Sequence, residues 1–254
     1  LLNAEVVNFT YIIAGGVFGA AVGAFMALRI QMTSMPQMVA LLNGFGGGAS
    51  LTIALAEYFS VLNVDANSFA ELLAPVALSS DAFGAGGEGQ VTLISIGLTI
   101  LIGAVTLVGS LVAFAKLQGL IKKNIGLPGG PAGNALLLIG AVIALACLII
   151  SPNQAVTVIT LVALALLLGL FLVLPIGGAD MPVVIALLNS YSGLAAALAG
   201  FILGNTVLII AGSLVGTSGL ILTKIMCVAM NRSLGNVLFG KMAAVGEKID
   251  ADEI

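Results

Sequence analysis

The sequence predicts an all-α integral membrane protein, a bundle of about seven transmembrane helices with a parallel internal repeat. The observations behind this prediction are an apolar composition, a series of apolar segments of membrane-spanning length, and one short motif that occurs twice. Hydrophobic residues make up 60% and charged residues 7% of the chain, and the mean hydropathy is +1.24. Soluble domains carry roughly 25% charged residues. A soluble fold of this size could not be covered with so few charges.

Apolar segments long enough to span a membrane follow one another along the chain. A helix of ~20 apolar residues crosses the hydrocarbon core. Such segments lie at about residues 8–28, 36–58, 91–115, 134–151, 154–174, 182–203 and 205–229. They are too long and too uniformly apolar to be the alternating strands of a barrel, and a helix satisfies its own backbone groups in lipid. The segments are therefore predicted to be transmembrane helices.

The positions of the cations predict the orientation of the chain. When the seven spans are threaded through a membrane, every Lys and Arg falls on the side that carries the C-terminus. These residues are Arg29, Lys116, Lys122, Lys123, Lys224, Arg232, Lys241 and Lys248. The opposite side carries the acidic loop that contains Asp65, Glu71, Asp81 and Glu88. By the positive-inside rule the basic side is cytoplasmic, or the matrix side in an organelle, so the N-terminus of this chain is expected outside and the C-terminus inside.

Regularly spaced glycines predict close helix packing. Gly15, Gly19 and Gly23 recur every four residues in the first span, and Gly212 and Gly216 do so in the last. This spacing gives a helix a smooth face on which a neighbouring backbone can approach.

Two other features are interpreted as having no ligand role. Residues 84–89 fit the dinucleotide pattern G-x-G-x-x-G, but no strand precedes them, so they are interpreted as a chance match in a flexible loop. Cys147 and Cys227 are expected to be small core residues. No metal site is expected in the chain.

A short motif occurs in two of the predicted spans. Residues 35–47 return as residues 181–193, with Met, Pro, Ala, Leu, Leu, Asn and Gly in matching places. More weakly, Ser110 and Lys116 correspond to Ser218 and Lys224. The two copies are the second and sixth spans and therefore point the same way. This arrangement is typical of a parallel repeat with a pseudo-two-fold axis along the membrane normal.

Each copy of the motif places an asparagine inside the membrane. Asn43 and Asn189 each follow the motif's proline by seven residues, ~10 Å along a helix that starts at that proline. Helical spacing adds small residues to the same faces, which could hold water. These residues are Gly46, Gly47, Ser192 and Gly193. Two interpretations stay open: the asparagines bridge helices, which is common in membranes, or they line a path for an ion.

A proton path would need a titratable group that the asparagines do not supply. The chain contains no His, and a side-chain amide does not titrate near neutral pH. The carboxylates nearest the spans, Glu57 and Asp180, lie close to their ends. Another subunit would have to supply the group, or the asparagines would have to orient water for one.

Four segments together resemble a known family. They are residues 176–184 (IGGADMPVV), 188–193 (LNSYSG), 214–219 (LVGTSG) and 230–233 (MNRS). They are similar to the membrane domain of the β subunit of proton-translocating NAD(P) transhydrogenase, and the similarity extends over essentially the whole chain. It implies that residues 1–230 conduct protons while hydride passes between NAD(H) and NADP(H) on soluble domains outside this chain. Residues 231–254 would form an inner-side segment and linker.

The resemblance also implies roles for individual residues. Asn189 matches an asparagine of the family's proton path. Ser218 lies in Thr217–Gly219, which matches a small polar cluster in the final helix of the family. Asp180 and Arg232 match charged residues at the inner surface that faces the NADP(H)-binding domain. Together with the repeat, this predicts a proton path through Asn43, Asn189, Ser192 and Ser218. Asn43 occupies the place of a His in familiar bacterial members, so we expect the α subunit to contribute a protonatable His that faces it.

The partners implied by the resemblance lie outside this chain. They are the membrane helices and NAD(H)-binding domain of the α subunit, an NADP(H)-binding domain after Ile254, two further helices before Leu1, and membrane lipid. A dimer of the αβ unit in a bacterial inner (plasma) membrane is expected, with no nucleic acid partner. The chain would belong to an enzyme yet would carry no hydride-transfer site and bind no cofactor itself.

Two other functions remain open from the residues alone. A secondary cation/proton transporter would explain the repeat and the paired asparagines, but no carboxylate lies well inside a span to bind the ion. A structural anchor for a soluble enzyme would fit if Asn43 and Asn189 were dry packing contacts.

Overall fold

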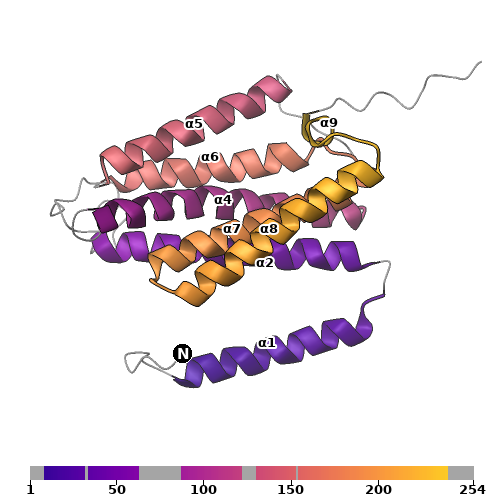
Figure 1. Ribbon diagram of the computed structural model, residues 1–254, viewed down its shortest axis with the longest axis horizontal. Helices are drawn as coiled ribbons and strands as arrows, with labels where there is room; N and C mark the ends of the chain where they lie inside the picture. Colours follow the sequence, from indigo (N-terminus) through magenta and orange to yellow (C-terminus); the bar gives the residue numbers. More distant parts are fainter. Residues whose placement is uncertain (1–8, 32–33, 63–86, 122–129, 153, 240–254) are drawn as a thin grey trace, which may run out of the picture. The chain divides into compact units, whose positions relative to one another are not determined.

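The computed structural model describes residues 9–31, 34–62, 87–121, 130–152 and 154–239, and the elements in this part of the chain are helices (Figure 1). The chain divides into two compact units, Leu1–Met35 and Pro36–Ile254. Each unit is described by itself.

The first unit contains α1, which spans Phe9–Arg29. Its sequence is apolar until Arg29, which ends the helix, and a cation there interacts favourably with the helix dipole. The Arg29 guanidinium lies over the Phe25 ring, 5.8 Å from the ring centroid. Gly15, Gly19 and Gly23 lie along one face of α1 and are exposed.

The described residues of the second unit form six helices that are long and apolar enough to cross a membrane. They are α2 (Met35–Leu62), α4 (Gly87–Leu117), α5 (Pro131–Ile150), α6 (Ala155–Val173), α7 (Met181–Ile202) and α8 (Thr206–Ala229). A 3-10 turn, η2 (Gly178–Asp180), precedes α7, and a short helix, α9 (Leu234–Phe239), follows α8. These six helices and α1 coincide with the seven predicted spans, although the apolar segment described in α1, Ile13–Arg29, is shorter than the six.

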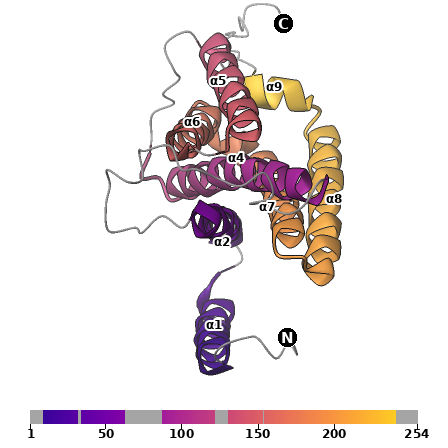
Figure 2. The same cartoon turned by 90° about the vertical axis from the view of Figure 1, so that its left-hand side faces the viewer.

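Helix α4 is the centre of the second unit. It packs against α6 on one side and α7 on another, while α5 packs on α6 and α8 packs on α7 (Figure 2). The backbone of α2 also reaches α4, because a methyl group added at Gly47 would lie 2.9 Å from the Gly103 carbonyl oxygen. Each of these helices thereby has one face buried against a neighbour, whereas apolar side chains such as Leu136 of α5 and Leu214 of α8 remain exposed on the outside.

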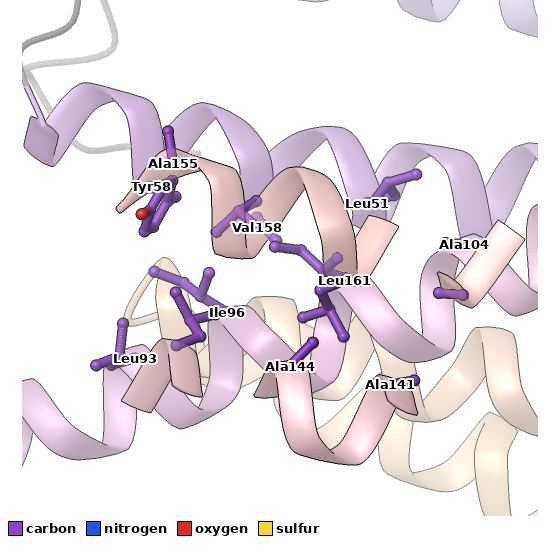
Figure 3. Close-up of a cluster of buried hydrophobic side chains, with 14 of the residues drawn as sticks. Leu51, Tyr58, Leu93, Ile96, Ala104, Ala141, Ala144, Ala155, Val158 and Leu161 are labelled. Atoms are coloured by element: carbon purple, nitrogen blue, oxygen red, sulfur yellow. The ribbon is translucent and has the colours of Figure 1, made fainter. Parts of the chain in front are cut away.

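One apolar core joins α2, α4, α5 and α6 (Figure 3). Ile96, Val158 and Leu161 are fully buried in it. Tyr58 is also fully buried, and its hydroxyl donates a hydrogen bond to the Pro152 carbonyl at 2.8 Å. A buried tyrosine needs such a partner for its polar end, so this bond fixes the end of α2 against the α5–α6 turn.

The helix ends follow from local sequence signals. Pro182 lies in the first turn of α7, where a missing N–H costs nothing. Gly204, with φ of 60°, makes the tight turn between α7 and α8, a conformation that glycine adopts without strain. Asn205 then caps α8, since its side-chain oxygen accepts a hydrogen bond from the Leu208 amide at 3.1 Å.

The two copies of the motif run in the same direction, as predicted. At the start of α2, the Gln37 side chain donates to the Leu117 carbonyl at the end of α4, at 3.0 Å. Just before α7, the Ile176 carbonyl accepts a hydrogen bond from Lys116, also at the end of α4. Helices α2 and α7 therefore both start at the end of the unit where α4 finishes.

Two sequence-based expectations are wrong. Gly87–Gly89 form the first turn of α4 rather than a flexible loop, because the helix continues beyond the apolar segment. Cys147 is exposed on α5 and is not a core residue, whereas Cys227 is buried. The expectations for Lys122, Lys123, Lys241, Lys248, Asp65, Glu71 and Asp81 concern positions outside the described residues.

Candidate functional site

Asn43 joins α2 to α7 through two hydrogen bonds. Asn43 is 8% exposed, and its Nδ2 donates to the Ile185 carbonyl at 3.3 Å. In return, the Ser192 hydroxyl donates to the backbone carbonyl of Asn43 at 3.0 Å. Asn43 lies about two turns from the start of α2, and its partners Ile185 and Ser192 lie about one and three turns from the start of α7. The contact between the repeated motifs therefore falls well inside the membrane-spanning part.

Asn189 lies at the same level as Asn43. It is half-buried on α7, one turn after Ile185 and one turn before Ser192. In an α-helix the amide N–H of Asn189 pairs with the Ile185 carbonyl, which is also the carbonyl that Asn43 contacts. Within the described part of the chain, the Asn189 side-chain amide makes no hydrogen bond. The Asn43 side chain and the Asn189 backbone N–H thus meet at the Ile185 carbonyl. The Asn189 side-chain amide is left available to water or to a partner.

The glycines of the motif bring backbones together. A methyl group added at Gly47 would lie 2.8 Å from Thr106 Cβ on α4. One added at Gly193, the matching residue, would overlap the backbone of Gly216 and lie 2.8 Å from the Gly212 carbonyl on α8. This confirms the predicted close approach at Gly212 and Gly216. Gly46 differs, since a methyl group there would meet Ser192 Oγ at an ordinary 3.8 Å.

Two buried serine hydroxyls, one on α4 and one on α7, have no hydrogen-bond partner among the described residues. The hydroxyls of Ser110 on α4 and Ser190 on α7 are fully buried and have no hydrogen-bond partner in the described chain. Ser110 lies against Gly44, and Ser190 lies against Gly219. A buried hydroxyl without a partner is costly. Sequence analysis assigned a role to neither serine.

Ser218 lies apart from the asparagines. It is exposed on α8, and its hydroxyl donates to the Val215 carbonyl of its own helix at 2.9 Å. Gly212, Gly216 and Gly219 form the face of α8 that is buried against α7. The spacing of these glycines is the sequence signal that marks the packed face and shows that Ser218 lies beside it. A path that includes Ser218 would need groups from outside the described chain.

Asp180 and Arg232 form an ion pair at the end where α7 starts and α8 finishes. Arg232 Nη1 donates to Asp180 Oδ2 at 2.8 Å. The Asp180 side chain is 8% exposed, whereas that of Arg232 is 47% exposed. The carboxylate is therefore fixed inside the bundle, and the guanidinium reaches toward the surface. The two residues predicted to couple the bundle to a nucleotide domain are thus in direct contact.

Acidic and metal-binding groups are scarce in the described chain. Glu57 is half-buried near the far end of α2. Among the described residues, no group of three or more His, Cys, Asp or Glu could hold a metal ion. Among the described residues, the polar chemistry is supplied by amides, hydroxyls, the Lys116 ammonium group and the Asp180–Arg232 ion pair.

Comparison with known proteins identifies the family. The family described as "NAD(P) transhydrogenase beta subunit" matches residues 1–253. The NAD(P) transhydrogenase subunit beta of Rhodospirillum rubrum is 39% identical over 250 residues, which are 97% of this chain and 50% of the relative. The subunit from a named strain of that species gives the same values. The chain thus spans half the length of the curated relatives it matches. It belongs to the NAD(P) transhydrogenase beta subunit family.

Proposed function

We propose that this chain is the proton-conducting membrane part of a proton-translocating NAD(P) transhydrogenase. In this proposal the complete enzyme couples proton movement to hydride transfer between NAD(H) and NADP(H). The observation that carries it is the contact between Asn43 and Ser192, on two helices that carry the same motif. Membership of the beta subunit family and six helices of membrane-spanning length support it.

The proposed path is built around the asparagines. Asn43 and Ser192 hold α2 and α7 together, and Asn189 presents a free amide at the same level. An amide can both donate and accept a hydrogen bond, so it can orient water, yet it cannot carry the proton itself. We propose that the partner α subunit supplies a protonatable His facing Asn43, and that Ser218 contributes from the exposed face of α8.

Coupling to the nucleotide chemistry is proposed to occur at the basic end of the bundle. The Arg232 guanidinium is half exposed and is held by buried Asp180. A domain that contacts Arg232 would therefore sense the position of α7, and α7 carries Asn189. A change in proton occupancy near the asparagines would then alter NADP(H) affinity, and NADP(H) binding would alter proton affinity to the same extent.

Both nucleotides are proposed to bind outside this chain. NADP(H) would be bound by a domain that follows residues 231–254, and NAD(H) by a domain of the α subunit; this chain itself would bind neither. The αβ unit would form a dimer in a bacterial inner membrane, with the basic end of this bundle in the cytoplasm.

The experiment uses the complete enzyme in inverted membrane vesicles. Hydride transfer from NADPH to an NAD analogue is followed by absorbance, and proton movement is followed with a pH-sensitive dye. We expect acidification or alkalinisation of the vesicles that depends on hydride transfer and disappears with a protonophore. Hydride transfer without any proton movement would instead make this chain a membrane anchor, and proton movement independent of both nucleotides would make it a transporter.

A further inference from the structure

The connection between α6 and α7 is buried, although it joins two membrane-spanning helices at one end of the bundle. Helix α6 ends at Val173, and η2 begins at Gly178. Between them, Leu174, Ile176 and Gly177 are all buried. A buried connection must find partners for its backbone carbonyls inside the protein, because water does not reach them.

The sequence of the connection increases the number of unpaired carbonyls. Pro175 has no N–H, so it cannot make the helical bond to the Phe171 carbonyl four residues earlier. The Leu174 and Ile176 carbonyls point beyond the end of α6. Side chains from two other helices supply the missing donors. Asn134 Nδ2 of α5 donates to the Phe171 carbonyl at 3.1 Å. Lys116 of α4 donates to the Leu174 and Ile176 carbonyls.

Lys116 makes two charge-assisted hydrogen bonds to this connection. Its Nζ donates to the Ile176 carbonyl at 2.6 Å and also to the Leu174 carbonyl. An ammonium group at the C-terminal end of a helix also interacts favourably with the helix dipole. Hydrogen bonds from a charged donor are roughly twice as strong as neutral ones. Lys116 therefore ties the α6–α7 connection to the end of α4 through two strong hydrogen bonds.

The end of α4 holds the starts of both asparagine-bearing helices. Lys116 binds the connection that leads through Asp180 into α7. The next residue, Leu117, accepts a hydrogen bond from Gln37 in the first turn of α2. Gln118 donates to the Gln37 side chain at 2.8 Å. Two residues at the end of α4 and the one that follows it thus bond to the start of α2 and to the connection that leads into α7.

We infer that Lys116 is a positioning residue for coupling between proton movement and the nucleotide domain. Its ammonium group holds the α6–α7 connection in place. This connection places Asp180 beside Arg232, and it determines the position of α7 along its axis. The position of Asn189 relative to Asn43 depends on it. The inference rests on the proposed function. It differs from a purely structural role because it concerns how many protons move per hydride transferred and not how much enzyme accumulates.

The test compares three variants of the complete enzyme in inverted vesicles. Lys116→Met removes the charge and both hydrogen bonds while keeping a flexible side chain. Lys116→Arg keeps the charge and the donors. Lys224→Met is the matched control, since Lys224 is exposed on α8 and its removal changes the net charge by the same amount. For each variant, proton movement and hydride transfer are measured on the same vesicles.

We expect Lys116→Met to lower the ratio of protons moved to hydride transferred by roughly tenfold, within the range usual for energetic coupling between sites. Lys116→Arg should restore most of the ratio, and Lys224→Met should leave it unchanged. Hydrogen–deuterium exchange of peptides that cover residues 174–180 should be faster in Lys116→Met than in the unmodified enzyme. If Lys116→Met does not accumulate, Lys116→Gln, which is shorter and uncharged, takes its place.

The outcomes separate this inference from the proposed function. An unchanged ratio in Lys116→Met, or in Lys116→Gln where that variant replaces it, overturns the role of Lys116. The same holds if hydride transfer and proton movement fall together in proportion. If the unmodified enzyme moves no protons during hydride transfer, the proposed function fails, and exchange of residues 174–180 still reports whether Lys116 fixes the connection.

Discussion

The Asn43 side-chain amide donates a hydrogen bond to the backbone carbonyl of Ile185, 3.3 Å away on α7. That carbonyl also belongs to the helical hydrogen bond of Asn189. Because a carbonyl oxygen has two lone pairs, it can serve both donors. The side chain of Asn43 and the backbone N–H of Asn189 therefore share one acceptor, the Ile185 carbonyl.

Asn43→Leu distinguishes helix bridging from a role in proton movement. A polar bridge between membrane helices contributes about 0.6 kcal/mol on average, so a bridge alone predicts slightly lower stability and normal proton movement. We expect proton movement per hydride to fall at least several-fold. The measurement is the vesicle assay combined with unfolding in mixed detergent micelles. Thr52→Val is the control, since Thr52 is exposed on α2 and bonds only within its own helix. Normal proton movement in Asn43→Leu would establish bridging.

The Asp180–Arg232 pair should respond asymmetrically to substitution. Arg232→Ala leaves a carboxylate that is 8% exposed without its partner, whereas Asp180→Asn leaves a half-exposed guanidinium that water can reach. A buried charge without a partner costs more free energy than an exposed charge without one. We expect Arg232→Ala to lower the free energy of unfolding by about 1–3 kcal/mol and Asp180→Asn by about half as much. Equal losses in mixed micelles would contradict this account.

Gly193→Ala should weaken the contact between α7 and α8. The added methyl group would overlap the Gly216 backbone, so the helices must separate. Overpacking of this kind costs about 1–3 kcal/mol. Gly46→Ala is the control because its methyl group would meet Ser192 Oγ at 3.8 Å, and its stability should stay within ~0.5 kcal/mol of the unmodified protein. The reverse order of stability in these two variants would rule out the glycine contact as the cause.

Pro175 and Asn134 should be energetically coupled. Asn134→Ala removes the donor that the Phe171 carbonyl depends on, at a cost of about 1–3 kcal/mol. Pro175→Ala adds a backbone N–H that can make the helical bond to that carbonyl. In the Pro175→Ala protein, Asn134→Ala should therefore cost clearly less. A double-mutant cycle of unfolding free energies measures the difference, and strictly additive losses would mean that Asn134 acts elsewhere.

Hydropathy located the helices well but not their ends. The segment predicted at 91–115 is part of a helix that spans Gly87–Leu117, and the segment predicted at 36–58 continues to Leu62. Helices extend past the apolar region because backbone hydrogen bonding continues through polar residues. Helix α9 was not predicted, since six residues give too little periodicity to recognise.

The repeat predicted the depth of Asn43 and Asn189, and the structure brings them to one level. It could not predict which helix faces which. Polarity does not indicate which face of α8 is buried, because apolar residues surround the helix on nearly all sides. Ser218 was therefore assigned to the proton path before the face on which it lies was known. The contacts of Lys116 were also missed, since its partners are backbone carbonyls 58 and 60 residues away. A lysine at the end of an apolar helix, followed later by a proline-broken helix end, is the signal that could have suggested them.

The glycine contacts also determine where water can enter the bundle. At Gly47 and Gly193 even a methyl group does not fit against the neighbouring backbone. A water molecule is ~2.8 Å across and needs polar partners, so it is excluded there as well. Water therefore does not pass between α2 and α4 at Gly47, or between α7 and α8 at Gly193. We therefore expect water to reach Asn43 along the flank between α2 and α7, where Gly46 is exposed and Ser192 is only partly covered.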